Sequence, residues 1–264
     1  MCFLPAEAIL WHATMALEIF TLRQRPELRQ QIFSAAFRPP LWPEFLLHDP
    51  AAELYFGSPH FDAYQDYAFA ALEDGRVIAR AFSVPFAFGI DGRHELPDGG
   101  WDEVIRWAHE DRSLGRSPTA VSALEISLLP AARGRGFSKV ILEAMRTNTR
   151  ELGFGDLYAP VRPTEKARQP FVPMRDYLAQ LRPDGLLRDP WLRTHVQAGG
   201  SIVKIAPYAM TIVGTVAEWS IWTGLHFDRA GPVAVDGGLS PAHICLEQDY
   251  GIYVEPGVWV HHRV

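Results

Sequence analysis

Residues 128–138 carry the strongest chemical signal in the chain, because arginine and glycine alternate there as Arg133-Gly134-Arg135-Gly136. In a loop between a strand and a helix, glycines allow a tight turn and the close approach of a ligand. The unpaired N–H groups of the first helical turn attract an anion. The two arginines add charge-assisted contacts to phosphate. The segment therefore predicts a phosphate or pyrophosphate site.

Two other phosphate-binding loops fit these residues poorly. A dinucleotide fingerprint needs a third glycine, and Lys139 stands at that position, deep in the chain rather than after its first strand. A Walker loop needs Gly-Lys-Ser/Thr, which does not occur. The remaining alternative is an ordinary strand–loop–helix joint with solvated arginines.

The elements on either side of the loop have the patterns that such a site needs. Residues 120–129 are apolar and strand-like and end at Pro130. Residues 134–152 have the apolar spacing of an amphipathic helix, with Gly153 placed to end it. Residues 156–161 predict the next strand. The middle of the chain is thus expected to be strand, basic glycine loop, long helix and strand.

The rest of the chain alternates strands and helices. Before the loop we expect a strand at 16–22, a helix at 26–37 opened by Pro26, an irregular segment at 39–63 with room for one helical turn, a hairpin of 67–72 with 76–86, and a helix at 101–112. After it we expect an insertion at 162–190 with a helix near 174–181, a helix at 191–198, strands at 201–206 and 209–213, and sheet with loops in the last 50 residues.

The loop resembles motif A of the GCN5-related N-acetyltransferases, (R/Q)-x-x-G-x-(G/A). Arg133, Gly136 and Ser138 stand at its marked positions, and serine departs from the final Gly/Ala. The element order is similar to the family core across residues 16–215. The resemblance implies an α/β (α+β) fold with a mixed central sheet, splayed at an acyl-CoA cleft and flanked by helices. It would form one domain at 15–264, with the insertion at 162–190 and an N-terminal extension at 1–14.

Three further runs, at 189–195, 214–219 and 253–259, are similar to a group of bacterial acetyltransferase-like proteins. The family resemblance also implies a reaction. An acyl-CoA, acetyl-CoA by default, would be the co-substrate, and its acyl group would pass directly to the amine of a small molecule without a covalent enzyme intermediate. The residues implied to line the pantetheine arm are Ile126, Ser127 and Leu128, and those implied to bind the pyrophosphate are Arg133, Gly134, Arg135, Gly136, Phe137 and Ser138.

Acid–base catalysis has several candidate residues. Glu125 and His195 are the candidate bases, each with a structural alternative: a hydrogen-bonded strand carboxylate and a half-buried histidine. Tyr177 or Tyr208 could protonate the leaving thiolate, although tyrosines more often pack in a core. Glu218 is a weaker candidate that could instead cap local structure. Without an assured base, a catalytically silent acyl-CoA-binding module stays open.

Charge bounds the partners. The net charge of −6 gives no general attraction to nucleic acid or to an anionic membrane. Residues 162–193 hold seven basic side chains against four acidic ones, which suits the CoA 3′-phosphate, an acidic acyl-carrier protein that delivers the acyl group, or simply a solvated face. The eight tryptophans and the apolar C-terminal strands could serve a homodimer or a core.

Composition bounds the class of protein. A 264-residue chain with 48% hydrophobic residues can bury a sizeable core. The N-terminal run lacks a basic n-region and contains Glu7, so it reads as neither signal nor membrane anchor. Two cysteines make no disulfide framework, which favours a cytoplasmic location. No spacing of histidine and cysteine, including His261-His262 and His243-x-Cys245, suggests a metal site.

Overall fold

The strands form one mixed sheet. Some of them, such as the strand at 68–73, are buried along nearly their whole length, and others, such as the strand at 156–161, alternate between buried and partly exposed residues. The computed structural model describes residues 17–38, 41–57 and 59–264; the predicted extension at 1–14 lies outside them. The sheet order is β1-β2-β3-β4-β5-β9-β8-β7, with β6 paired to β9. The strands are β1 (Glu18–Thr21), β2 (Ala68–Glu73), β3 (Arg76–Phe86), β4 (Ala120–Leu128), β5 (Asp156–Val161), β6 (Ser201–Gly214), β7 (Gly231–Val233), β8 (Ala242–Cys245) and β9 (Tyr250–Arg263).

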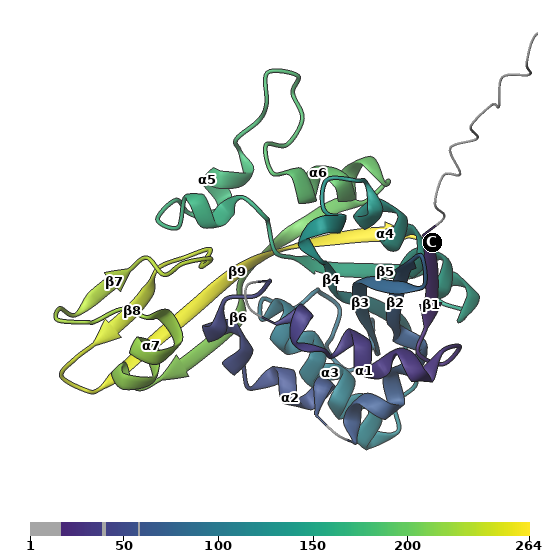
Figure 1. Ribbon diagram of the computed structural model, residues 1–264, viewed down its shortest axis with the longest axis horizontal. Helices are drawn as coiled ribbons and strands as arrows, with labels where there is room; N and C mark the ends of the chain where they lie inside the picture. The colour runs from purple at the N-terminus through teal and green to yellow at the C-terminus, as the bar shows by residue number, and fades with distance from the viewer. Residues whose placement is uncertain (1–16, 39–40, 58) are drawn as a thin grey trace, which may run out of the picture.

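Helices cover both faces of this sheet. They are α1 (Arg29–Ile32), α2 (Ala51–Phe56), α3 (Gly100–Leu114), α4 (Phe137–Glu151), α5 (Met174–Leu178), α6 (Pro190–Gln197) and α7 (Val216–Thr223). Short 3₁₀ segments occupy Pro26–Leu28, Ala35–Phe37, Glu44–His48, His60–Tyr67, Pro130–Ala132 and Lys166–Arg168. Helices α1, α2 and α3 lie on one side of the sheet and α4 and α6 on the other (Figure 1).

The two faces have separate apolar cores. On the first, Phe82 and Phe86 of β3 pack with Tyr55 and Phe61 and with the apolar stripe of α3. On the second, β4 and β5 pack against α4 through a cluster that includes Val121, Leu157, Ile141, Leu142 and Met145. Burial of each amphipathic stripe fixes the position of its helix on the sheet.

Strands β4 and β5 part soon after they meet. Phe82 of β3 pairs with Glu125 of β4, but Ser83 pairs with Ala123, so Leu124 is an extra residue in a β-bulge. The parallel pairing of β4 with β5 covers only Val121↔Leu157 and Ser122↔Tyr158. The prediction of a mixed sheet that is splayed at a cleft and flanked by helices is therefore confirmed.

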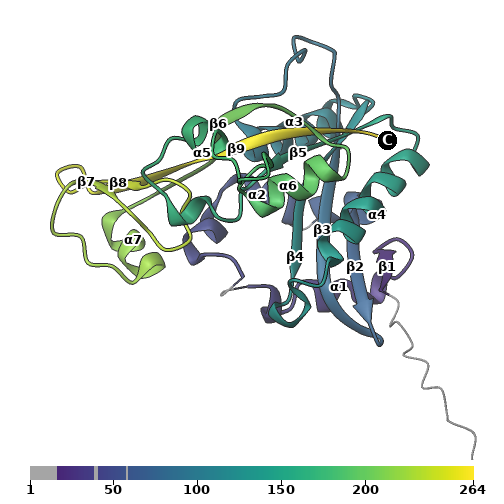
Figure 2. The same ribbon diagram turned by 90° about the horizontal axis from the view of Figure 1, so that it is seen from above.

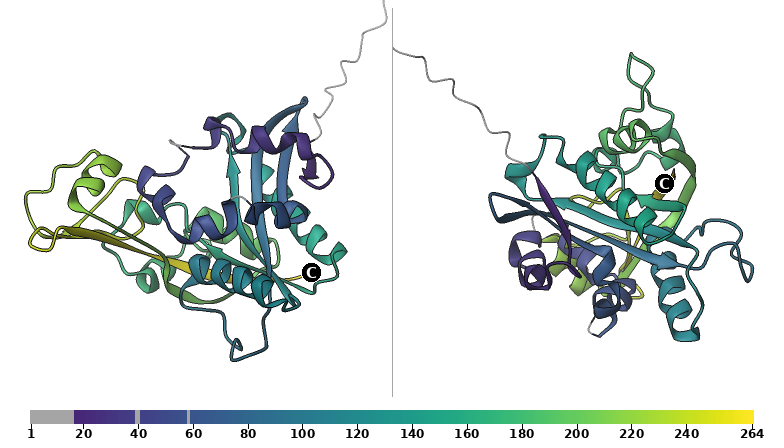
Figure 3. Two further views of the ribbon diagram at one scale, coloured as in Figure 1. Left: turned by 90° about the horizontal axis from the view of Figure 1, so that it is seen from below. Right: turned by 90° about the vertical axis from the view of Figure 1, so that its right-hand side faces the viewer.

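A long ribbon of β6 and β9 joins the central sheet to an outlying arm. The end of β9 pairs with β5, whereas its beginning pairs with β8. Figure 2 shows the ribbon running from the central sheet out to β7, β8 and α7, and Figure 3 shows α3 packed along it. Phe45, Trp219 and Tyr253 form the core of this arm. Strand β9 is thus part of both the central sheet and the outlying arm.

Several predicted elements need correction. The predicted helix at 26–37 is broken into a 3₁₀ turn, α1 and a second 3₁₀ turn. The described part of the segment predicted to be irregular at 39–63 holds α2 and two 3₁₀ segments, and the two strands predicted at 201–213 are one strand, β6, with a register shift between Ala206 and Met210. Helix α7 was not predicted. Five of its eight residues are apolar and they lie all round the helix, so they show no helical period.

Candidate active site

The gap between β4 and β5 opens into a cavity of about 1100 Å³. Residues 123–128 of β4 form one wall, and Ala159, Pro160 and Val161 of β5 lie opposite. Leu124, the bulged residue, lines this space together with Trp101, whose indole Nε1 donates to the Leu124 carbonyl at 3.1 Å. An extended thioester arm fits such a slot, because unpaired strand N–H groups can polarise its carbonyl.

The predicted pyrophosphate loop lies at one end of this cavity. Gly134 and Gly136 adopt left-handed φ angles of 75° and 78°, which only glycine takes readily. Gly136 is the N-cap of α4 and no side chain caps the helix, so its first N–H groups are available to a ligand. Arg133, Gly134 and Ser138 line the cavity. The loop, the cleft and the helix dipole thus converge on one anion site.

A curated relative decides the family. The chain is 30% identical over 272 aligned residues to a protein named arginine N-acetyltransferase avaD from Aspergillus versicolor, a match that spans 92% of this chain and 93% of the relative. The chain belongs to the GCN5-related N-acetyltransferase (GNAT) superfamily. It is an N-acyltransferase with an acyl-CoA as its co-substrate. No family model matches the sequence.

Two solved structures share the GNAT fold over nearly the whole chain. The loading GNATL domain of CurA from Lyngbya majuscula is 18% identical, with a TM-score of 0.58 and coverage of 94% of this chain and 98% of that domain. The GphF GNAT-like decarboxylase in complex with isobutyryl-CoA is also 18% identical, with a TM-score of 0.51 and coverage of 93% and 98%. At this identity the likeness establishes the fold.

The residues predicted to line the pantetheine arm of the acyl-CoA lie on the cavity wall. Ile126, Ser127 and Leu128 all face it at the open end of β4. The indole Nε1 of Trp42 donates to Ser127 Oγ at 3.2 Å, so residues around Trp42 also border this groove. Their place between the β-bulge and the pyrophosphate loop suits a pantetheine chain that joins a thioester to a pyrophosphate.

Arg135 differs from its neighbour Arg133. Its guanidinium forms a two-pronged salt bridge with Glu73, with Nη1 at 2.8 Å from Oε2, and it lies over the ring of Phe137. The hydrogen bond from Arg135 lowers the pKa of the Glu73 carboxyl below its ordinary value. Phe137, Arg135 and Gly136 do not line the cavity, whereas Arg133 does. The expectation that both arginines hold pyrophosphate therefore has geometric support only for Arg133.

We predict unequal effects of removing these two charges. Arg133→Gln should weaken acetyl-CoA binding by about 1–3 kcal/mol, because a charge-assisted contact to phosphate is lost. Arg135→Gln, the matched control, should cost less than half as much, since Arg135 is held by Glu73. Isothermal titration calorimetry with acetyl-CoA measures both. A larger loss in Arg135→Gln would mean that this arginine leaves Glu73 to bind phosphate.

Glu125 is the first of the predicted bases, and it forms an ion pair with Arg80. Its Oε1 accepts from Nε of Arg80 at 2.6 Å and its Oε2 from Nη2 at 3.3 Å. Arg80 is fixed in turn by the Ile32 carbonyl at 2.9 Å and by the faces of Phe37 and Phe82. A carboxylate held by both oxygens in a nearly buried ion pair is poorly placed to take a proton from a substrate. The geometry favours the structural role for Glu125.

His195, the second predicted base, forms a buried pair with His262. Its Nδ1 lies 2.9 Å from His262 Nε2, and both rings are almost fully buried. Burial, followed by the influence of His262, lowers the pKa of His195 to about 3. Burial is also the main cause that lowers the pKa of His262 to about 4. His195 borders the cavity, but with so low a pKa it is a weak base.

This pair predicts a dependence of stability on pH. The unfolded histidines gain protons below about pH 6.5, whereas the folded pair stays neutral until pH 4 to 3, so the folded state is destabilised as the pH falls through this window. Between pH 6.5 and 5 the loss should be about 2 kcal/mol per histidine. Urea unfolding at both values measures it. His262→Gln should reduce the fall by about half, and an unchanged fall would rule the pair out as its source.

Tyr177 lies in the core of the insertion and away from the cavity. Its hydroxyl donates to Asp189 Oδ2 at 2.9 Å, while Asp189 Oδ1 accepts from the first N–H groups of α6. Burial, followed by Asp189, raises the pKa of Tyr177, which makes it a poorer proton donor. Tyr208 is half exposed and Glu218 forms a capping box with Thr215 on α7. These positions favour structural roles for Tyr177 and Glu218.

The basic side chains of residues 162–193 mostly have partners within the protein, although Arg168 and Arg175 are exposed. Arg162 binds Glu255, and Lys166 Nζ is buried and donates to the carbonyls of Gln169 and Leu239. The others have partners nearby, in Arg168–Glu165, Arg175–Asp176, Arg182–Asp184, Arg188–Gln180 and Arg193 with the carbonyls of Leu187 and Arg188. The segment therefore offers less free positive charge than its composition suggests.

Acidic residues that were not predicted line the cavity on the other side of β4. Glu44, Asp49 and Glu53 come from the segment around α2, and Glu255 comes from β9. Asp49 and Glu255 are buried, at 4% and 2% exposure. No sequence pattern links these residues, because they are brought together from segments about 200 positions apart. In the part of the chain that the structure describes, no group of three or more histidine, cysteine or acidic side chains could hold a metal ion.

Proposed function

We propose that this GNAT enzyme transfers the acetyl group of acetyl-CoA to an amine of arginine or of a closely related cationic amino compound. The acidic wall of the cavity carries this proposal. Among the acidic residues that line the cavity, Glu125 and Glu255 form ion pairs with Arg80 and Arg162. The lining residues between positions 38 and 53 include three further acidic side chains and one arginine: Glu44, Asp49, Glu53 and Arg38. Such a wall attracts a cationic acceptor and repels an anionic one.

The name of the curated relative supports the same acceptor class. That relative is named as an arginine N-acetyltransferase and aligns over nearly the full length of both chains. Arginine at neutral pH carries an ammonium group to be acylated and a guanidinium group for recognition. Two cationic groups on one small molecule suit a cavity with several carboxylates.

CoA, rather than the arm of a carrier protein, is the donor in this proposal. An acidic carrier protein would need unpaired positive charge beside the entrance, whereas the insertion pairs Arg162, Arg168, Arg175 and Arg182 with acidic side chains and buries Lys166. The free thiol of Cys245 fits a reducing cytoplasm as the compartment. The described residues contain no helix that is both long and apolar enough to cross a membrane.

The experiment is a thiol-release assay with acetyl-CoA and a panel of amines. Arginine should be acetylated with a kcat/KM at least tenfold above that of citrulline, which keeps the α-amine but lacks the cationic side chain. Mass spectrometry identifies the product. Equal turnover of arginine and neutral amines would overturn the cationic acceptor. Binding of acetyl-CoA without thiol release from any amine would favour the catalytically silent module.

A further inference from the structure

The proposed reaction needs a group that takes a proton from the acceptor ammonium, and Asp49 is available for it. Among the acidic residues of the cavity wall, Glu125 and Glu255 have both oxygens bonded to neighbours, and Glu44 and Glu53 are exposed. Asp49 is buried at 4% exposure and uses Oδ1 to accept from the Ala51 N–H at 2.8 Å. Its Oδ2 has no donor among the described residues.

Asp102 of α3 is paired with Asp49. It is 1% exposed, and its Oδ2 accepts from the Thr211 N–H of β6 at 3.1 Å and from Arg106 Nη2 at 3.5 Å, whereas its Oδ1 has no donor in the described part of the chain. The two carboxyls are close enough to shift each other's pKa, and the oxygens without another donor among the described residues are Asp49 Oδ2 and Asp102 Oδ1. Two buried carboxylates in contact cannot both ionise, so the pair shares one proton.

Burial of both carboxyls and the repulsion between their charges favour the form of the pair that holds one proton. Burial and then the charge of Asp49 raise the pKa of Asp102 to about 9, so at neutral pH Asp102 is the protonated partner and donates to Asp49. Burial also raises the pKa of Asp49 above its ordinary value, which makes Asp49 a stronger base than an exposed aspartate. The charged groups that face the pair are Arg106 of α3 and Glu255 of β9.

The pair lies near the β-bulge of the cleft. Trp101, next to Asp102 at the beginning of α3, donates to the carbonyl of the bulged Leu124 at 3.1 Å. Asp49, Trp101 and Leu124 all line the same cavity. A thioester that lies along β4 and an amine that enters from the acidic wall would therefore meet within reach of Asp49.

We propose that Asp49 is the proton acceptor for the acyl acceptor and that Asp102 is the positioning residue that holds it. This inference rests on the proposed function. One proton of the acceptor ammonium passes to Asp49, and the freed nitrogen lone pair attacks the thioester carbon. As the tetrahedral intermediate collapses, the C–S bond breaks, its electron pair leaves with sulfur, and a second N–H proton passes to the thiolate. Asp49 then releases its proton to solvent.

The first test is Asp49→Asn with arginine and acetyl-CoA. We expect kcat to fall by about 10²- to 10⁴-fold, as for removal of a general base, with an unchanged dissociation constant for acetyl-CoA. In the wild type, kcat/KM should fall on acidification with a midpoint above the ordinary pKa of aspartate. In the variant that midpoint should vanish, and the rate should rise tenfold per pH unit toward the pKa of the amine. A variant that keeps the wild-type kcat and pH profile would overturn the proposal.

The second test compares two variants of Asp102. Asparagine can keep both hydrogen bonds of a protonated aspartate, accepting from the Thr211 N–H and donating to Asp49, whereas alanine keeps neither. We expect Asp102→Ala to lower kcat by at least tenfold and Asp102→Asn to restore most of that loss. Equal losses would show that no proton is shared, and this comparison also decides the matter if Asp49→Asn does not fold.

Failure of this inference is distinct from failure of the proposed function. Wild-type enzyme that releases thiol with arginine while both Asp49→Asn and Asp102→Ala remain fully active would leave the function standing and remove the pair from it. Wild-type enzyme that acetylates no cationic amine would instead remove the proposed function. A rise in KM alone in Asp49→Asn would reassign Asp49 to binding of the acceptor cation.

Discussion

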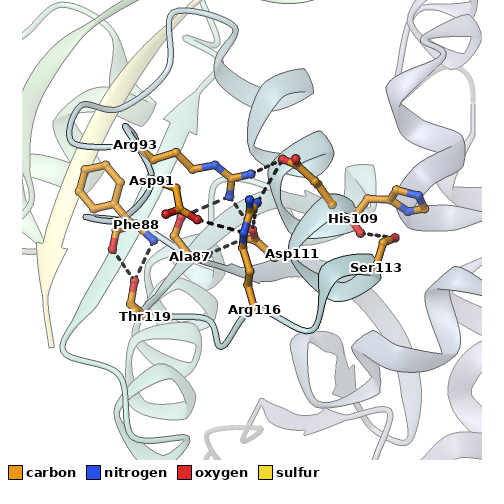
Figure 4. A network of polar contacts seen from close by, with 10 residues as sticks. Ala87, Phe88, Asp91, Arg93, His109, Asp111, Ser113, Arg116 and Thr119 are labelled. Atoms are coloured by element: carbon orange, nitrogen blue, oxygen red, sulfur yellow. Dashed lines mark hydrogen bonds and ion pairs between the residues drawn. The ribbon is translucent and has the colours of Figure 1, made fainter.

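Replacing Asp111 by alanine is expected to lower the free energy of unfolding by about 3 kcal/mol, because it leaves the buried guanidinium of Arg93 with only the half-exposed Glu110 as a carboxylate partner and the Ala87 N–H without an acceptor. Asp111 Oδ1 accepts from Arg93 Nη1 at 2.7 Å, and its Oδ2 accepts from the Ala87 N–H at 2.7 Å (Figure 4). The side chains of Arg93 and Asp111 are 8% and 4% exposed, so water cannot replace either contact. Arg116 adds a weaker contact at 3.5 Å.

This network bears on the site because it anchors α3. Asp111 lies near the end of α3, whereas Trp101 and Asp102 lie at its beginning, beside the cavity. Urea unfolding measures the loss, and Asp111→Asn is the matched control that keeps the volume and one acceptor. We expect the asparagine variant to lose less than the alanine variant. A loss below about 1 kcal/mol in Asp111→Ala would show that Arg93 is solvated by a local rearrangement.

The strand, loop and helix around residues 133–138 could be predicted because the information for them is local. An apolar strand, alternating arginine and glycine, and an amphipathic helix follow one another within about 35 residues, and each obeys a short-range rule. The role of Arg135 was less predictable, since its partner Glu73 lies 62 positions earlier in the chain. Local patterns find a loop, but they do not find the side chains that compete for its charges.

Helix α7 and strand β6 were mispredicted for different reasons. The five apolar residues of α7 are spread round the helix, so hydrophobic periodicity does not indicate a helix there. The capping-box signature Thr215-x-x-Glu218 could have found its beginning. Strand β6 contains Pro207, which suggests an interruption, but the register shift between Ala206 and Met210 accommodates it within one strand. The pairing with β9 therefore keeps residues 201–214 in a single strand.

The buried carboxyls in and beside the cavity could not be predicted from the sequence for a third reason. Asp49, Asp102 and Glu255 belong to three segments that only the folded sheet brings together. The pKa of each carboxyl depends on its burial and on the neighbouring charges, and neither can be read from the residue type alone. The predicted bases failed for the opposite reason. Glu125 and His195 are suitable residue types that line the cavity, but the fold places Arg80 against the first and His262 against the second.

Removing the carboxylate of Glu255 is expected to have the other large effect, because this residue joins three segments: β9, the loop that holds Gly237 and Leu239, and Arg162. Its Oε1 accepts from Arg162 Nε at 2.8 Å and its Oε2 from the hydroxyl of Tyr253, which itself accepts from the Leu239 N–H at 2.7 Å. Arg162 also donates to the Gly237 carbonyl. Glu255→Ala would leave Arg162 unpaired beside the cavity and Tyr253 without an acceptor.

We expect Glu255→Ala to lower the free energy of unfolding by about 3–5 kcal/mol. Glu255→Gln is the matched control, because the amide keeps an oxygen for Arg162 and loses only the charge; it should cost less. Urea unfolding separates the two, and acetyl-CoA calorimetry reports whether the cleft survives. Since Glu255 also faces Asp49, loss of its negative charge should lower the pKa of Asp49 and shift the acid midpoint of kcat/KM downward in Glu255→Gln. An unshifted midpoint would mean that Asp49 and Glu255 do not interact, and an upward shift would contradict the sign of their interaction.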